Sequence, residues 1–167
     1  FSLNWGIGNI DVDPCFADTG YWNSNGTPED PNDDFWVDGD YHLQSQAGRW
    51  DPNSKNWVED EATSRCIDAG NPGSPLGDEP NDANNLRIDM GAYGGTVEAS
   101  KTPMEWSLLA DLTNDGIVDI NDLAAQVEDW LQNDDEQSGD LNCDGTVNFA
   151  DFALLAGDWL KLKIIID

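Results

Sequence analysis

The sequence has very little positive charge. Seven of its 167 residues are Lys or Arg and 34 are Asp or Glu, which gives a formal net charge of −27 at pH 7. Binding to phosphates requires a basic face, so this composition excludes nucleic acids and anionic membrane surfaces as partners. The same acidity suits a secreted protein in a calcium-rich medium, where cations screen the repulsion between carboxylates. We therefore expect an extracellular protein.

Histidine, cysteine and long apolar runs are also scarce. No apolar run is long enough to cross a membrane. The one histidine, His42, lies on an expected strand with no serine or cysteine nucleophile in a recognisable context, so we expect no catalytic residues and no enzyme. Of the three cysteines, Cys15 and Cys66 are candidates for a disulfide. Cys143 lies in an acidic loop, either as a neutral substitution or as the site of an intermolecular disulfide.

Near the C-terminus the chain contains an internal repeat. Residues 111–131 read DLTNDGIVDINDLAAQVEDWL and residues 140–160 read DLNCDGTVNFADFALLAGDWL. The offset is 29 residues, and ten of the 21 aligned positions are identical. A repeat at a fixed offset indicates a duplicated structural unit.

Each copy has the ligand pattern of a calcium loop. Calcium prefers about six to eight oxygen ligands, and a loop supplies them when oxygen-bearing side chains recur at every second position around a glycine turn. We therefore expect two Ca²⁺ ions, with further ions at other acidic loops left open. The expected ligands are Asp111, Thr113, Asp115, Ile117, Asp119 and Asp122 in the first loop, and Asp140, Asn142, Asp144, Thr146, Asn148 and Asp151 in the second.

A helix is expected to begin near the end of each loop. Apolar residues follow at helical spacing, and the two apolar stripes are expected to pack together. The stripes consist of Leu123, Val127, Trp130 and Leu131 in the first copy, and Phe152, Leu155, Trp159 and Leu160 in the second. No incoming helix precedes either loop, because EWSLLA (105–110) looks like a short strand and QNDDEQSG (132–139) like a polar linker.

A duplicated loop–helix unit with Asp at the last ligand position resembles the type I dockerin module over about residues 108–162. The resemblance implies two calcium ions, folding on calcium binding and docking onto a cohesin-like protein. In that family loop positions 10 and 11 often carry a polar pair that selects the partner. Here these positions are Ile120 and Asn121 in one copy and Phe149 and Ala150 in the other. The apolar residues suit a hydrophobic contact within the chain or between chains.

The first hundred residues contain short apolar segments between Gly, Asn, Asp and Pro, which favours short strands and wide loops. The segments GNIDVDPCF, DGDYHLQSQAGRWDP, SRCIDAGNP and RIDMGAYGGTVEASK resemble, in that order, the C-terminal end of right-handed parallel β-helix proteins of the pectate-lyase-like, Planctomycetes type. The expected fold is therefore mixed: terminal β-helix rungs with long loops at 1–101, a linker or short strand at 102–110, the dockerin-like calcium module at 111–161 and a strand-like tail at 162–167.

Eight tryptophans stand out in a chain with few other large apolar residues. We expect those of the first region to supply much of a thin core, with a sugar-stacking platform as the alternative. They are Trp5, Trp22, Trp36, Trp50 and Trp57.

The tail LKIIID has the composition of a strand, with Ile164, Ile165 and Ile166 in sequence. It is expected either to pair with EWSLLA inside the chain or to be donated to a neighbouring molecule. With an exposed solenoid end, the second option favours head-to-tail self-assembly.

The favoured function is thus a secreted calcium-binding structural protein that self-assembles into a filament or tube. The alternatives are a dockerin-type module attached to a cohesin-like scaffold and the remnant of a polysaccharide-degrading β-helix enzyme.

Overall fold

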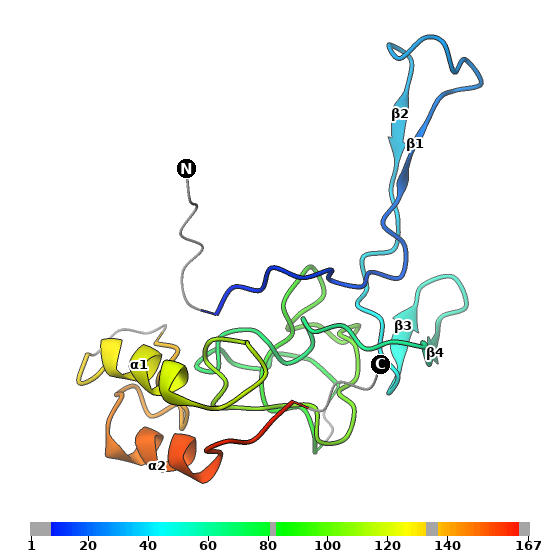
Figure 1. Ribbon diagram of the computed structural model, residues 1–167. Coiled ribbons are helices and arrows are strands. Elements are labelled where there is room, and N and C mark those ends of the chain that lie inside the picture. The colour runs from blue at the N-terminus through cyan, green and yellow to red at the C-terminus, as the bar shows by residue number, and fades with distance from the viewer. Residues whose placement is uncertain (1–7, 81–82, 133–136, 164–167) are drawn as a thin grey trace.

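The computed structural model describes residues 8–80, 83–132 and 137–163 (Figure 1). Three parts are visible: two helices at one end, a body of loops, and a hairpin that projects away from the body at the other end. We call residues 18–40 the arm, residues 41–110 the body and residues 111–160 the helical module. The elements are β1 (Tyr21–Asn23), β2 (Phe35–Val37), β3 (Arg49–Asp51), β4 (Asn56–Val58), α1 (Ile120–Glu128) and α2 (Phe149–Gly157). Neither helix is long and apolar enough to cross a membrane, within the part of the chain that is described.

The arm is the antiparallel β1–β2 hairpin. Trp22 lies opposite Trp36, with their ring centroids 5.6 Å apart in an edge-to-face arrangement. The two segments that join the arm to the body cross closely at the base of the arm. A Cβ atom on Gly39 would lie 2.2 Å from the Asp18 carbonyl oxygen there. A glycine is therefore required at that crossing.

The second hairpin, β3–β4, is part of the body and has a similar cross-strand pair of tryptophans. Trp50 pairs with Trp57 at a centroid distance of 5.7 Å, and the Lys101 ammonium lies 4.4 Å from the Trp57 ring centroid. Both rings are half-buried, in contrast to those of the arm. Neither hairpin contributes a tryptophan to the apolar core clusters, so the prediction that the tryptophans of the first region supply much of the core is wrong for Trp22, Trp36, Trp50 and Trp57. Trp5 lies outside the described residues.

Side-chain hydroxyl groups hold the loops of the body together. Leu43, Ile67 and Trp106 form its small apolar core. Because there is little sheet, buried carbonyl groups need other donors. The Trp106 indole donates to the Ile67 carbonyl at 3.1 Å. Three hydroxyls do the same over long sequence separations: Ser45 to Lys101 at 2.6 Å, Ser64 to Pro14 at 2.7 Å and Ser100 to Leu43 at 2.5 Å.

The expected right-handed parallel β-helix is wrong. Within the described ranges the strands form two antiparallel two-stranded sheets and two antiparallel bridges, and no parallel pairing occurs. The segments 66–70 and 86–95 do lie side by side, since the Met90 amide donates to the Cys66 carbonyl and the Gly70 amide to the Ile88 carbonyl, both at 2.9 Å. They are turns rather than rungs, because left-handed backbone at Asp68 (φ 51°) interrupts extended structure.

Two buried carboxylates lie where these segments meet. Asp68 is 1% exposed and Asp89 is 5% exposed. The Asp68 amide donates to Asp89 Oδ1 at 2.9 Å, and the Thr102 hydroxyl donates to Asp68 Oδ1 at 3.1 Å, but neither Oδ2 atom has a partner among the described residues. Burial raises the pKa of Asp68 to about 7 and that of Asp89 well above its ordinary value. Both groups therefore favour the protonated form.

This burial predicts that the body loses stability as the pH rises. A carboxyl whose pKa is raised in the folded state contributes stability that is fully present below the unfolded pKa, about 4, and is lost as the pH passes through about 7. Over that window Asp68 should lower the free energy of unfolding by about 1 kcal/mol per pH unit. Urea unfolding at saturating calcium should therefore show a falling midpoint from pH 5 to pH 7. Asp68→Asn should flatten this slope, and an unchanged slope would contradict the assignment.

Candidate metal centre

Each helix begins directly from its acidic loop through a capping box. Asp119 caps α1 and Asn148 caps α2, each accepting a hydrogen bond from the amide two residues further on. Asp122 and Asp151 complete the boxes by accepting from the cap amides, at 2.7 and 2.8 Å. These two carboxylates also lie in the first turn, where the helix dipole favours negative charge. The residues at loop positions 9 and 12 thus fix where each helix starts, so both helices and their starting points are confirmed.

The two loops have the same internal hydrogen bonds. The Asp111 carboxylate accepts from the amides of Asp115 (3.2 Å) and Gly116 (3.0 Å). The Asp140 carboxylate accepts from the amides of Asp144 (3.1 Å) and Gly145 (2.8 Å). The amide at loop position 3 donates to the carboxylate at position 12, at 3.0 Å in the first loop and 3.1 Å in the second. The chain therefore wraps around the carboxylates at positions 1 and 12 in both copies.

Left-handed backbone closes each loop at two matching positions. Asn114 and Cys143 have φ values of 57° and 56°, and Gly116 and Gly145 have values of 92° and 86°. Asparagine tolerates this conformation well, whereas cysteine does so at some cost. The turn expected at loop position 6 is therefore present in both copies.

Four of the predicted ligand side chains are buried. Asp111 and Asp140 are 3% and 7% exposed, and Asp122 and Asp151 are fully buried. Burial, followed by the nearby Asp122 charge, raises the pKa of Asp111. Residues 111–160 contain no lysine or arginine, so the sequence of the module supplies no positive charge to compensate these groups. Such burial is costly unless something positive is bound.

The remaining predicted ligands are spread around the loop rims. Asp115, Ile117, Asn142 and Asp144 are exposed, and Thr113, Asp119, Thr146 and Asn148 are half-buried. Within residues 8–80, 83–132 and 137–163, no three His, Cys, Asp or Glu side chains converge closely enough to form a ready-made metal cage. The donor set does fit calcium in kind, because carboxylate, amide, hydroxyl and carbonyl oxygens are what this ion prefers.

The two repeats are cross-connected behind the loops. The Leu131 amide, after α1, donates to the Val147 carbonyl of the second loop at 3.0 Å. The Leu160 amide, after α2, donates to the Val118 carbonyl of the first loop at 2.8 Å. Both valines are fully buried. These contacts were not predicted from the sequence, although Val118 aligns with Val147 and Leu131 with Leu160 in the repeat.

The first loop is bound to the body and the second is much freer. Asn114 Nδ2 donates to the Ala69 carbonyl at 2.8 Å, and Arg87, itself buried, donates to the Asp111 carbonyl at 2.6 Å. The tail residue Lys163 donates its amide to the Gly116 carbonyl at 2.8 Å. On the second loop the Cys143 thiol lies 3.8 Å from the Pro72 carbonyl. The body thus holds the first site in place more firmly than the second.

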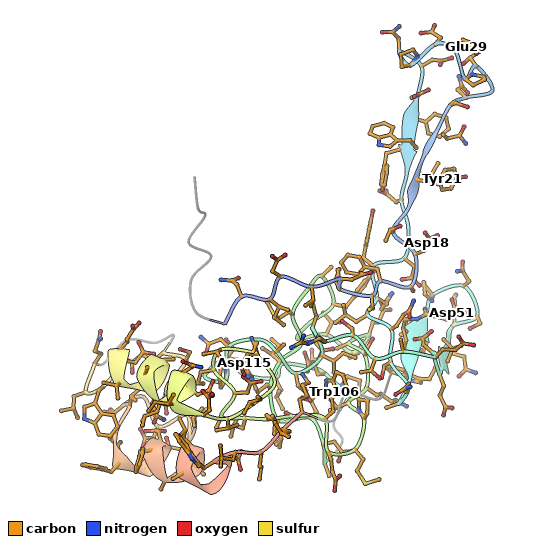
Figure 2. All side chains as sticks on the ribbon, viewed as in Figure 1. Asp18, Tyr21, Glu29, Asp51, Trp106 and Asp115 are labelled. Atoms are coloured by element: carbon orange, nitrogen blue, oxygen red, sulfur yellow. The ribbon has the colours of Figure 1, made fainter. Side chains whose placement is uncertain are left out.

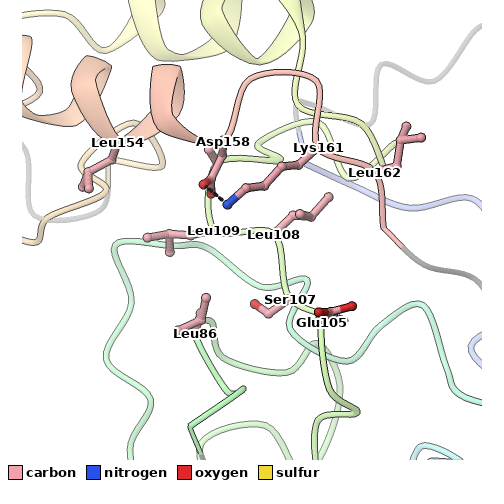
Figure 3. Close-up of a pocket in the computed structure, with 10 residues that line it drawn as sticks. Leu86, Glu105, Ser107, Leu108, Leu109, Leu154, Asp158, Lys161 and Leu162 are labelled. Carbon is pink, nitrogen blue, oxygen red and sulfur yellow. Dashed lines mark hydrogen bonds and ion pairs between the residues drawn. The ribbon is translucent and has the colours of Figure 1, made fainter.

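Part of the expected tail strand is visible. Leu162 forms an antiparallel bridge with Ile117 of the first loop, so the described part of the tail pairs there and not with residues 105–110. Ile164, Ile165 and Ile166 lie outside the described residues. Beside this segment is a groove of about 530 Å³ between the body and α2, with the ion pair of Asp158 and Lys161 at its edge, 2.6 Å long (Figure 3).

The predicted partner-binding residues are on the surface. Ile120 and Phe149 are 62% and 77% exposed, and Asn121 and Ala150 are exposed as well. Phe149 stands edge-on to Trp130, with the ring centroids 5.1 Å apart. A second, almost entirely apolar groove of about 350 Å³ opens here between the helices. It is lined by Leu123, Val127, Trp130, Phe149 and Phe152, and we call it the aromatic groove.

The histidine and the cysteines have structural surroundings. His42 is buried, with Nδ1 2.5 Å from Asp40 Oδ1, Nε2 3.5 Å from Glu98 Oε2, and the ring stacked on Tyr93. Its two nitrogens thus face carboxylates and not a reactive hydroxyl or thiol. The thiols of Cys15, Cys66 and Cys143 are free, so the candidate disulfide between the first two is not formed here.

Comparison with known proteins gives one partial match. The sequence model of a family described as "Disaggregatase related" matches residues 6–70. This segment contains the arm and the β3–β4 hairpin and ends before the calcium-type loops. No curated protein and no solved structure matches the chain.

The loop geometry predicts two calcium sites that respond separately to mutation. Titration calorimetry should give two ions per chain. Asp115→Ala and Asp144→Ala should each reduce this to one, because each removes a carboxylate at loop position 5. Asp158→Ala is the matched control, since it removes an acidic residue of the same module that pairs with Lys161 outside the loops. Two ions in either loop variant would refute the ligand assignment.

Proposed function

We propose that this chain is an extracellular, non-enzymatic structural protein that binds two Ca²⁺ ions and self-assembles. The observation that carries the calcium proposal is the pair of matching loops, which bury four carboxylates in a module without lysine or arginine. The helical module resembles a type I dockerin, for which calcium-dependent folding is the expectation. Calcium would supply the positive charge that the module lacks.

Calcium should act on the whole module and not on one loop at a time. Each loop accepts a hydrogen bond from the end of the other repeat's helix, through Val118 and Val147. Ordering one loop therefore orders the docking point of the other helix, and metal binding becomes folding free energy for both. At a concentration one hundred times its dissociation constant, each ion would stabilise the module by about 2.7 kcal/mol.

Self-assembly is supported by apolar surface that the chain itself leaves uncovered. Tyr21 and Trp22 of the arm are 56% and 66% exposed, and Phe149 of the helical module is 77% exposed. Concentrated exposed apolar patches of this kind mark interaction sites in soluble proteins. With the β-helix excluded, this surface replaces the solenoid end as the reason to expect assembly.

Assembly should depend on calcium. At millimolar calcium, negative-stain images and sedimentation should show filaments or tubes, and EGTA should dissolve them while far-UV circular dichroism loses helix signal. Magnesium at equal ionic strength is the control, because it prefers a smaller octahedral site and should not restore the fibres. Monodisperse monomers at millimolar calcium would contradict the proposal.

A second candidate function is calcium-dependent docking onto a cohesin-like scaffold. The exposure of Ile120 and Phe149 at the loop positions that select partners in dockerins favours it. In a pull-down with cohesin domains, Phe149→Asp should reduce capture by roughly tenfold or more, as for an interface anchor. Ala150→Ser is the mild control at the neighbouring position. No capture of the unmodified chain in calcium would dispose of this candidate.

A further inference from the structure

One short segment of the body, residues 65–70, contacts the first calcium-type loop through side chains of both partners. Asn114 Nδ2, at loop position 4, donates to the Ala69 carbonyl at 2.8 Å. From the body, Arg65 Nη2 donates to the Asp115 carbonyl at 3.4 Å. The body therefore holds the middle of the loop, where the chain turns, and not only the ends.

The buried guanidinium of Arg87 extends this contact to the start of the loop. Its Nε donates to the Gly70 carbonyl at 3.0 Å, and its Nη1 donates to the Asp111 carbonyl at 2.6 Å. The side chain is 2% exposed. A guanidinium presents its five N–H donors in a rigid fork, so it fixes the spacing of the carbonyls that it joins. Arg87 therefore keeps the 69–70 turn of the body and the first residue of the loop in one arrangement.

The tail residue Lys163 connects the same loop to the apolar core of the body. Its amide donates to the Gly116 carbonyl at 2.8 Å, and its ammonium donates to the Ile67 carbonyl at 3.2 Å. The ammonium also lies 4.6 Å from the ring centroid of Trp106, which belongs to the same core cluster as Ile67. Figure 2 shows Asp115 of the loop at the side of the module next to the body, and Trp106 among the body loops. A shift of the loop turn thus reaches the core through one side chain.

The second loop differs from the first at the matching positions. Cys143 replaces Asn114 at loop position 4, with the same left-handed backbone, φ 56° against 57°. A thiol is a weak donor and cannot replace the carboxamide of asparagine. A Cβ atom added to Gly145 would meet nothing within 4 Å, whereas one added to Gly116 would lie 3.7 Å from Lys163. The two loops are thus alike inside and differ in how they join the body.

We propose that the first calcium site and the body are energetically coupled, with Arg87, Asn114 and Lys163 as positioning residues, and that the second site lacks this direct coupling. The inference rests on the proposed calcium binding and adds an asymmetry between the two sites. Residues 111–116 carry the first ligands of the loop and also the carbonyls that accept from the body. Calcium would hold this backbone in the arrangement that the body recognises. By linkage, the folded body raises the calcium affinity of this site by the same factor.

Charge acts against this coupling, and Asn114 allows the two effects to be separated. Arg65, Arg87 and Lys163 are three of the seven basic residues of the chain, and their charge disfavours a cation in the first loop. Removing one of them therefore removes a contact and a repulsion together. The Asn114 amide is uncharged and lies at a position that supplies no predicted ligand. Its loss changes the contact alone.

Hydrogen exchange of the full chain, with calcium and with EGTA, tests the coupling. Segments 66–70 and 86–90 report on the body, because two main-chain hydrogen bonds join them. Saturating calcium should slow exchange in both segments by about tenfold or more, within the usual range of coupling between sites. The slowing should persist in Asp144→Ala, which lacks a ligand of the second loop. It should be largely lost in Asp115→Ala, which lacks the matching ligand of the first.

A matched pair of variants tests the positioning role. Asn114→Gly and Cys143→Gly change the same loop position, and glycine accepts the left-handed backbone of both. Asn114→Gly should reduce the calcium-dependent protection of the body about fivefold, as for the loss of a hydrogen bond. In the Asp144→Ala background it should weaken calcium binding to the remaining site by a similar factor. Cys143→Gly should change neither quantity. If Asn114→Gly does not fold, Lys163→Met removes the ammonium contact and gives the same readout.

Titration calorimetry on the same samples separates the possible outcomes. If the unmodified chain binds two ions and calcium protects the body equally in Asp115→Ala and Asp144→Ala, the coupling is wrong and calcium binding stands. Equal behaviour of Asn114→Gly and Cys143→Gly would overturn the positioning role of Asn114. A chain that binds no calcium would overturn both the coupling and the proposed function.

Discussion

The electrostatic repulsion inside the two acidic loops is the constraint on which the rest of this structure depends. Asp111, Asp122, Asp140 and Asp151 are buried in a module that contains no lysine or arginine. Backbone amides satisfy part of their hydrogen-bonding capacity, but an amide carries only a partial charge. Folding the module therefore leaves a charge deficit at two fixed places. The calcium ions that we propose would correct this deficit without a covalent change, and they would then act as structural components and not as a signal.

Two basic side chains next to the first loop, Arg87 and Lys163, donate hydrogen bonds to main-chain carbonyls and not to the loop carboxylates. Arg87 is 2% exposed and donates to main-chain carbonyls, among them that of Asp111, and not to a carboxylate. Lys163 is also buried enough that its pKa falls to about 8, and its ammonium donates to the Ile67 carbonyl at 3.2 Å. Both side chains fix the first loop against the body, and the Arg87 charge offsets part of the rise that burial causes in the pKa of Asp111. The second loop has fewer such contacts, so the proposed calcium ion would contribute a larger share of its order.

The features that could be predicted from the sequence are those controlled by contacts between residues that are close together in the chain. The helices Ile120–Glu128 and Phe149–Gly157 and their loop starts were predicted because the controlling contacts, such as the amide of Asp119 with Asp122, lie within a few residues. The β-helix was wrong because short apolar segments such as CIDAG are compatible with strands and with buried turns alike. Contacts between residues far apart decide between them, including Ser100 with Leu43 and Asp68 with Thr102. The pairing of Trp22 with Trp36 was overlooked for the same reason, although two tryptophans flanking a turn-rich segment were a usable signal.

The position of the aromatic residues explains why the molecule has two apolar surfaces rather than one larger core. The residues between Gly20 and Gly39 leave the body at a crossing so close that no side chain fits at its base, and this directs Trp22 and Tyr21 outward. At the other end, the cross-connection of Leu131 with Val147 fixes α1 beside the second loop and leaves Trp130 and Phe149 on the outside of the module. Neither arrangement can relax inward without breaking the contact that creates it. The exposed rings are thus a consequence of the fold's own constraints.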